Sequence, residues 1–143
     1  MISYGLNDAR GGTPLDLFLE EMTQLVKRVR DAIDPVIVLP GPYFMTDFNL
    51  GHESGFGLGD LGVFKEYNKG IGRLAGELNC LYVDLLNAYQ ETEWMIHYDG
   101  VHANDLGHRI VANRTFEVIA QNCSCIARWT KEQEKTSSRW RDE

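Results

Sequence analysis

The residue types in this sequence that are best suited to chemistry are an aspartate and a histidine three positions apart, Asp99 and His102. On a turn that leads into a helix, such an aspartate can accept a hydrogen bond from one nitrogen of the imidazole ring. That bond fixes the tautomer of the ring and leaves its other nitrogen free to act as a general base. We therefore predict an acid–base pair at these two positions.

A second candidate site lies near the start of the chain, in the stretch Tyr4-Gly5-Leu6-Asn7-Asp8. A glycine permits a tight turn at the end of a strand, because it has no side chain to restrict the backbone. The side-chain amide of an asparagine can donate a hydrogen bond to an oxygen on which negative charge develops during a reaction. We predict that Gly5 and Asn7 belong to an oxyanion- or substrate-binding site.

Apolar strands and amphipathic helices alternate along the chain, and these elements must position the candidate residues. The expected strands cover residues 1–4, 36–39 and 80–84, and the expected helices cover residues 14–33, 64–78 and 104–120. This alternation predicts a three-layer α/β/α fold, in which a parallel sheet lies between two layers of helices. Functional groups in such folds gather at the carboxyl ends of the strands.

The length and composition of the chain fit one domain, since it has 143 residues, of which 43% are hydrophobic and 24% are charged. We expect this domain to cover residues 1–128, and we predict a disordered polar tail at 129–143. The net charge is −7 and no basic stripe is present, which speaks against a nucleic-acid partner. No apolar run is long enough to span a membrane. The first residues do not resemble a signal peptide, so the location stays open, with the cytoplasm as the default expectation.

Taken together and in this order, the two motifs resemble the SGNH, or GDSL-type, hydrolase family. Gly5-Leu6-Asn7-Asp8 is similar to the family's G-x-N-D block, whose asparagine supplies an oxyanion donor. Asp99-Gly100-Val101-His102 is similar to its D-x-x-H block, which supplies the acid and base of a Ser-His-Asp triad. The resemblance implies a flavodoxin-like fold and a serine esterase, lipase or acetylesterase activity. It also implies small-molecule, carbohydrate or lipid esters as substrates and no cofactor.

The chain departs from the family in its nucleophile. The family's Gly-Asp-Ser block precedes the G-x-N-D block, and this chain begins almost on the latter. None of the five serines follows Gly-Asp; they are Ser3, Ser54, Ser124, Ser137 and Ser138. We therefore expect the C-terminal part of such an enzyme, with its N-terminal strands missing, to be inactive by itself. Whether the chain is an enzyme stays open, and we expect its exposed strand edge at residues 2–4 to favour self-association.

Other interpretations of the same sequence are weaker. A non-catalytic remnant that acts as a binding or interaction module is the main alternative. The stretch Gly57-Leu58-Gly59-Asp60-Leu61-Gly62 imitates a dinucleotide fingerprint, but the preceding strand ends far upstream at Leu39. His97, Asp99, His102 and His108 do not have the spacing that places three ligands on one helical face. We therefore expect no metal site, and we rank a nucleotide-binding domain last.

Overall fold

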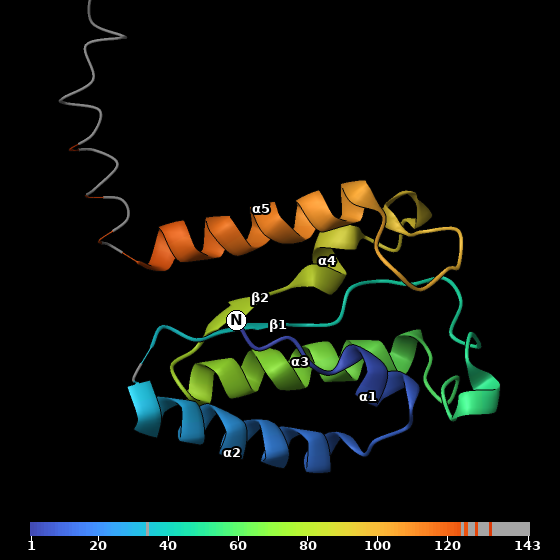
Figure 1. Ribbon diagram of the computed structural model, residues 1–143, viewed down its shortest axis with the longest axis horizontal. Coiled ribbons are helices and arrows are strands. Elements are labelled where there is room, and N and C mark those ends of the chain that lie inside the picture. The colour runs from blue at the N-terminus through green and yellow to red at the C-terminus, as the bar shows by residue number, and fades with distance from the viewer. Residues whose placement is uncertain (34, 124, 126–127, 129–131, 133–143) are drawn as a thin grey trace, which may run out of the picture.

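A two-stranded parallel sheet lies at the centre of the computed structural model, which describes residues 1–33, 35–123, 125, 128 and 132. Strand β1 (Val38–Pro40) pairs with β2 (Leu81–Val83), so that Val38 lies opposite Leu81. Helices cover both faces of this sheet, with α2 and α3 on one side and α4 and α5 on the other (Figure 1). The α/β class with a parallel sheet is therefore confirmed. The tail predicted at 129–143 lies outside the described residues, except for Glu132.

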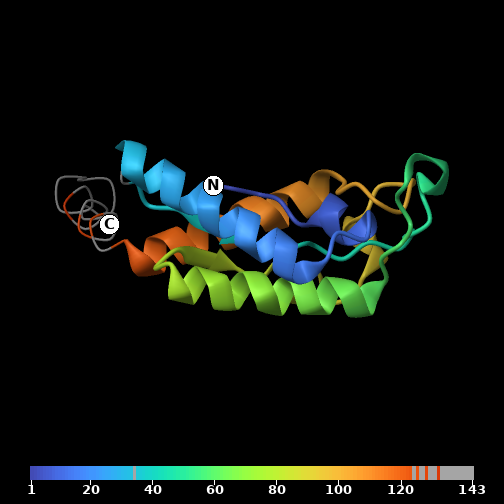
Figure 2. The same cartoon turned by 90° about the horizontal axis from the view of Figure 1, so that it is seen from below.

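Within the residues that the structure describes, five α-helices and two short 3-10 helices surround the sheet. They are α1 (Leu6–Arg10), α2 (Leu15–Ile33), η1 (His52–Ser54), α3 (Leu61–Glu77), α4 (Leu85–Tyr89), η2 (Glu93–Met95) and α5 (Asp105–Asn122). From below, α2 and α3 lie side by side across one face of the molecule (Figure 2). None of the helices that the structure describes is long and apolar enough to cross a membrane.

The three long helices form where the apolar pattern predicts them, and side-chain caps set the starts of α3 and α5. Asp60 accepts a hydrogen bond from the Val63 N–H at 2.9 Å, which starts α3 three residues earlier than the apolar pattern predicts. Helices α2 and α3 bury apolar side chains at helical spacing and pack against each other, with the Phe18 and Tyr67 rings 4.9 Å apart. This interface forms most of the larger core cluster, which also includes Leu39 of β1.

The strand predicted at residues 1–4 does not form, so a sheet with this strand as a third member is wrong. Ile2 lies beside β1 and donates its N–H to the Val38 carbonyl at 2.9 Å. The adjoining bond of a parallel ladder would run from the N–H of residue 40 to the Ile2 carbonyl. Residue 40 is a proline and has no N–H to donate, so the ladder stops after one bond.

Candidate active site

A small hairpin positions the predicted acid–base pair. Ile96 and Ala103 form an antiparallel bridge, and the His97 N–H donates to the His102 carbonyl at 2.6 Å. The turn needs a glycine at position 100, where φ is +73° and a Cβ would lie 2.6 Å from the Asp47 Cβ. The turn thus brings residues 97, 99 and 102 together at the surface.

Asp99 and His102 are in direct contact. The His102 Nδ1 atom lies 2.6 Å from Asp99 Oδ2, while Asp99 Oδ1 accepts the N–H groups of Val101 and His102, each at 2.9 Å. These bonds, above all that from the imidazole, hold the pKa of the Asp99 carboxyl well below its usual range. The Nε2 atom of His102 has no hydrogen-bond partner among the described residues, and 71% of this side chain is exposed. Asp99 thus orients His102 and leaves its outer nitrogen open to a substrate.

Asn104 joins this hairpin to the start of α5, and the sequence pattern predicts only its role as the cap of that helix. Its Oδ1 accepts the Gly107 N–H at 3.0 Å and caps α5, as its place before the helix indicates. Its Nδ2 also donates to the carbonyls of Trp94 at 2.7 Å and Ile96 at 3.1 Å. Gly107 permits this close fit, because a Cβ there would overlap the Met95 carbonyl oxygen. One asparagine therefore fixes the hairpin to the start of α5.

The predicted Gly5 and Asn7 lie at the start of α1. Gly5 has a φ of +110°, and a Cβ there would come within 3.2 Å of the buried Phe18 side chain. Its N–H donates to Asp8 Oδ2 at 3.0 Å, so this N–H is not free to bind a substrate. The Asn7 side chain is exposed and has no hydrogen-bond partner among the described residues. Of these two residues, Asn7 is the one with a free donor.

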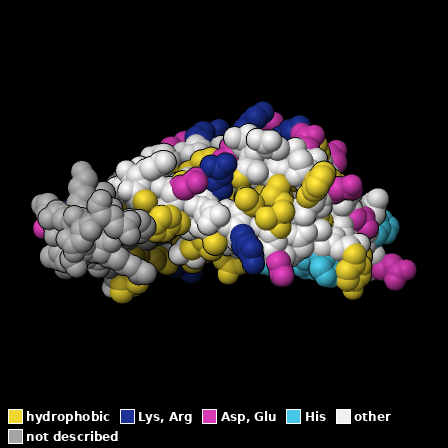
Figure 3. Space-filling model, turned by 90° about the horizontal axis from the view of Figure 1, so that it is seen from above, with side chains coloured by type: hydrophobic (Ala, Val, Ile, Leu, Met, Phe, Trp, Pro, Cys, Tyr) yellow, Lys and Arg dark blue, Asp and Glu magenta, His cyan; other side chains and the backbone are white. Residues whose placement is uncertain are grey.

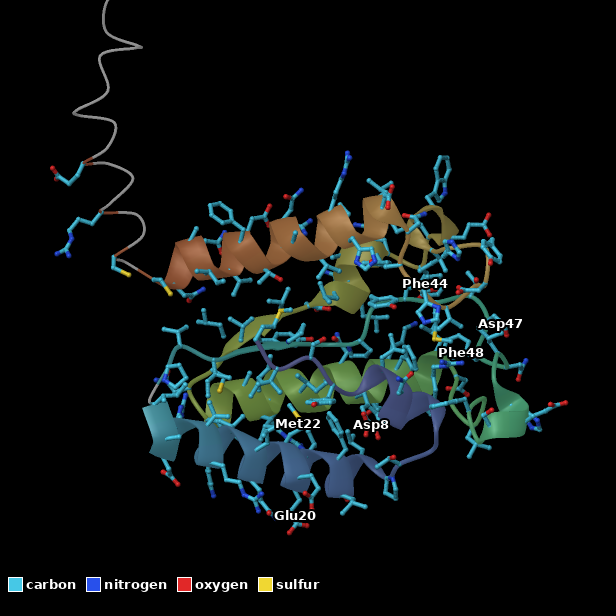
Figure 4. All side chains as sticks on the ribbon, viewed as in Figure 1. Asp8, Glu20, Met22, Phe44, Asp47 and Phe48 are labelled. Carbon is cyan, nitrogen blue, oxygen red and sulfur yellow. The ribbon has the colours of Figure 1, made fainter. Side chains whose placement is uncertain are left out.

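The segment between β1 and α3 connects the two parts of the candidate site. The N–H groups of Thr46 and Asp47 donate to the Gly100 carbonyl at 2.8 and 2.9 Å, and the Leu50 carbonyl accepts from Arg10 of α1. Because residues 47 and 50 are only three apart, these two anchor points are within about 11 Å of each other. Figure 4 places Asp47 and Phe48 on this segment, beyond the carboxyl ends of both strands. The segment between β1 and α3 therefore contacts both the hairpin that carries His102 and the helix α1 that carries Asn7.

Arg10 is a buried charge that the sequence analysis missed. Its side chain is 6% exposed, its guanidinium lies 5.0 Å from the centre of the Phe56 ring, and it donates to the Leu50 carbonyl. Leu50 is forty residues away in the sequence, and no local pattern links the two positions. Arg10 ties α1 to the long segment and so helps to place Asn7.

No serine of the described chain is hydrogen-bonded to His102. Ser3 and Ser54 are exposed, whereas Ser124, Ser137 and Ser138 lie outside the described residues.

Figure 3 shows histidine side chains at the end of the molecule that carries the hairpin. Among the described residues, no group of three or more histidine, cysteine, aspartate or glutamate side chains could hold a metal ion.

The glycine-rich stretch before α3 has a packing role. A Cβ on Gly59 would overlap the Ala9 carbonyl oxygen, so this glycine allows the segment to approach α1. The Asp60 carboxylate occupies the N-terminus of α3, where a phosphate group would bind in a dinucleotide site. The resulting charge repulsion speaks against the nucleotide-binding alternative, as does the 3-10 helix η1 that precedes this stretch in place of a strand.

The sequence profile of the GDSL-like lipase/acylhydrolase family matches residues 1–110, which include both motifs. The chain belongs to this family. The resemblance to GDSL-type hydrolases is therefore confirmed, and with it the interpretation of the fold. A comparison with curated proteins found no significant match.

Solved structures of esterases and of a lipase/acylhydrolase share the fold of this family member. A lipase/acylhydrolase from Enterococcus faecalis matches with a TM-score of 0.66 at 19% identity, over 82% of this chain and 58% of that one. A catalytic mutant of an acetylxylan esterase from Geobacillus stearothermophilus gives 0.62 at 22%, over 82% and 57%. The esterase domain of the ORF1 protein of a zebrafish retrotransposon gives 0.60 at 16%, over 75% and 60%. The chain thus spans less than two thirds of each of these structures.

Proposed function

We propose that this chain supplies the acid–base residues and an oxyanion donor for the hydrolysis of carboxylic esters by a GDSL-type mechanism. In this proposal Asp99 and His102 are catalytic, Asn7 binds the oxyanion, and Gly5 forms the turn that presents Asn7. The 2.6 Å contact between His102 Nδ1 and Asp99 Oδ2 is the observation that carries the proposal. We infer small-molecule, carbohydrate or lipid esters as substrates, as the names of the family and its solved members suggest.

In the proposed reaction, a serine hydroxyl attacks the carbonyl carbon of the ester while Nε2 of His102 takes its proton. Asp99 stabilises the imidazolium that forms, and the Asn7 amide donates a hydrogen bond to the oxyanion. His102 then gives the proton to the departing alcohol, which leaves an acyl-serine. A water molecule, deprotonated by His102, attacks the acyl group. His102 returns this proton to the serine oxygen as the acyl–oxygen bond breaks, which releases the carboxylic acid and the free serine.

The serine of this reaction comes, in our proposal, from a Gly-Asp-Ser block, which residues 1–143 do not contain. The solved family members have more than a third of their length outside the part that this chain matches. We propose that a segment of that kind supplies the nucleophile, and that the 143-residue chain alone does not turn over esters.

Hydrolysis of a p-nitrophenyl ester tests this proposal. The chain alone should give no more product than its His102→Ala variant. Addition of a separately expressed segment that carries the Gly-Asp-Ser block should produce turnover, which Asp99→Asn should lower by about 10⁴-fold. His102→Ala should abolish this turnover, and His52→Ala, a change of an exposed histidine on η1, should not affect it.

Two results would contradict the proposal. Burst-phase turnover by the chain alone that depends on His102 would reveal an unrecognised nucleophile within it. Turnover of the combined segments that persists in the His102→Ala variant would remove this histidine from the mechanism. The alternative of a non-catalytic binding module predicts no turnover by the chain alone and none after the second segment is added. It also predicts that Asp99→Asn leaves the binding of an ester analogue unchanged.

A further inference from the structure

A second imidazole lies beside the carboxylate of the acid–base pair. The Nδ1 atom of His97 is 3.6 Å from Asp99 Oδ2, the same oxygen that His102 Nδ1 contacts at 2.6 Å. The two histidines face each other across the hairpin, where the His97 N–H donates to the His102 carbonyl. Their Nδ1 atoms are therefore no more than about 6 Å apart. Two titratable rings thus share one oxygen.

The other charged groups near this hairpin are already engaged or make no contact with these rings. Asp47 reaches the turn through its backbone, and its Oδ1 accepts the N–H groups of Asn49 and Leu50 within its own loop. Tyr43 lies close enough for the Asp99 charge to affect it, although burial is the main reason that its pKa is raised. Glu93 on η2 and Asp105 on α5 form no ion pair with either histidine.

The aromatic ring of Tyr98 packs on His97, with the ring centres 4.1 Å apart. The His97 side chain is 46% exposed, so it remains open to solvent beside Tyr98. Within the described part of the chain, Asp99 is the one carboxylate paired with either ring. Asp99 is therefore the counter-charge for both histidines.

Sharing one carboxylate oxygen makes the two rings compete. At 3.6 Å a neutral His97 is beyond hydrogen-bond distance from Asp99, so the carboxylate serves His102 alone. A protonated His97 is attracted to Asp99 and also places a positive charge near His102. Both effects make it harder for His102 to take a proton, which is the step a general base must perform.

We propose that His97 is a positioning residue coupled to His102 through the Asp99 Oδ2 atom, so that a positive charge on either ring lowers the basicity of the other. The inference rests on the proposed function for its effect on catalysis. The electrostatic coupling between the two rings is a property of the hairpin itself and can be measured without any reaction.

The test follows the ring signals of the four histidines in the full chain by NMR as the pH is varied. His97→Lys keeps a positive charge at this position over the whole range, whereas His97→Asn is neutral. We expect the midpoint of the His102 titration to be about half a pH unit lower in His97→Lys than in His97→Asn. The matched pair His52→Lys and His52→Asn, on the exposed helix η1, should give equal His102 midpoints.

A second variant keeps the inference testable if the lysine disturbs the hairpin. His102→Asn removes the second ring that shares the Asp99 oxygen. If His97 is the ring that titrates at lower pH, the midpoint of its titration should therefore rise by at least about half a pH unit in this variant. If His102 titrates at lower pH, its own midpoint should rise by that amount in His97→Asn. Equal His102 midpoints in the lysine and asparagine variants at position 97, or no rise in either second measurement, would overturn the inference.

The pH dependence of ester hydrolysis by the combined segments separates this inference from the proposed function. The acid limb of the profile should lie at lower pH in His97→Lys than in His97→Asn, by the same half unit. Shifted NMR midpoints without any His102-dependent hydrolysis would contradict the proposed function and leave the coupling intact. Hydrolysis that depends on His102 but has the same acid limb in both variants would overturn the inference and leave the function intact.

Discussion

Asp99 accepts three hydrogen bonds from its own turn, and all three come from residues two or three positions further along the chain. The two backbone bonds fix the carboxylate through Oδ1, which leaves Oδ2 to face the imidazole. A histidine that follows by three residues therefore meets a carboxylate whose orientation is already set. This local geometry is why spacing alone predicts the contact between Asp99 and His102.

The lowered pKa of Asp99 makes part of the stability of the fold depend on pH. Between its folded and unfolded pKa values, the unfolded chain binds the proton more tightly, so stability falls as the pH decreases through this range. The contribution is fully present above the unfolded value of about 4 and is lost below it. We expect the free energy of unfolding to fall less steeply below about pH 4 in Asp99→Asn than in the unchanged chain.

Urea unfolding at several pH values between about 2.5 and 7 measures this effect. Asp31→Asn is the matched control, because Asp31 is an exposed aspartate that has no ion pair among the described residues. An acid-side slope in Asp99→Asn equal to that of the unchanged chain would show that the bonds to this carboxylate do not stabilise the fold.

Residues that act over long sequence distances could not be predicted in this way. Arg10 meets the Leu50 carbonyl forty positions away, and the link depends on how the long segment folds back on α1. No spacing rule links His97 to this pair, and the geometry of the hairpin shows that it lies beside the same Asp99 oxygen as His102. Local spacing predicts the contact between Asp99 and His102, whereas the position of His97 beside them is visible only in the folded chain.

At the scale of elements, the apolar pattern predicted the three long helices and both strands, with ends that differ by a few residues. The failed strand at residues 1–4 has a cause that is also present in the sequence, since Pro40 cannot donate to a ladder. The short helix α1 follows the turn at Gly5 and α4 follows the end of β2, and at both places turn geometry rather than apolar periodicity decides the structure. Such short elements carry too little pattern to predict.

Asn104 is the residue that joins the hairpin to α5, so truncation of its side chain should destabilise both the hairpin and the first turn of this helix. We expect Asn104→Ala to lower the free energy of unfolding by about 2 kcal/mol, because a helix cap and two bonds to backbone carbonyls are lost. Asn113→Ala, on the exposed face of α5, should change it by less than about 0.5 kcal/mol. Chemical denaturation measures both values, and equal effects of the two changes would contradict the role of Asn104 as a clasp.

At the scale of the whole molecule, the segment beside β1 presents an open edge. Tyr4 is 61% exposed and Met1 is 67% exposed. The groove at Tyr4 has an apolar part, formed by Tyr4, Phe18, Met22 and Leu25, and a charged or polar part, formed by Asp8, Glu21, Gln24 and Arg28. Open backbone groups beside apolar surface favour association with another chain. The self-association predicted from the sequence remains a prediction, now placed at this edge.

Sedimentation velocity between about 1 and 100 μM tests this prediction. The average mass should rise with concentration, and Tyr4→Lys should reduce the rise, because a charge on an edge opposes pairing. Trp94→Lys is the control, since it changes a residue that is 78% exposed on η2, away from this edge. A monomer at all concentrations, with a sharp two-state melt, would contradict the prediction.

The central claim is that Asp99 holds His102 in the tautomer that a general base needs, with the proton on Nδ1 and a free lone pair on Nε2. ¹⁵N NMR of the imidazole ring at about pH 8 measures this directly, because protonated and unprotonated ring nitrogens have different chemical shifts. We predict a protonated Nδ1 on His102 in the unchanged chain and a loss of this preference in Asp99→Asn. A proton on Nε2 in the unchanged chain, with no change in Asp99→Asn, would contradict the account.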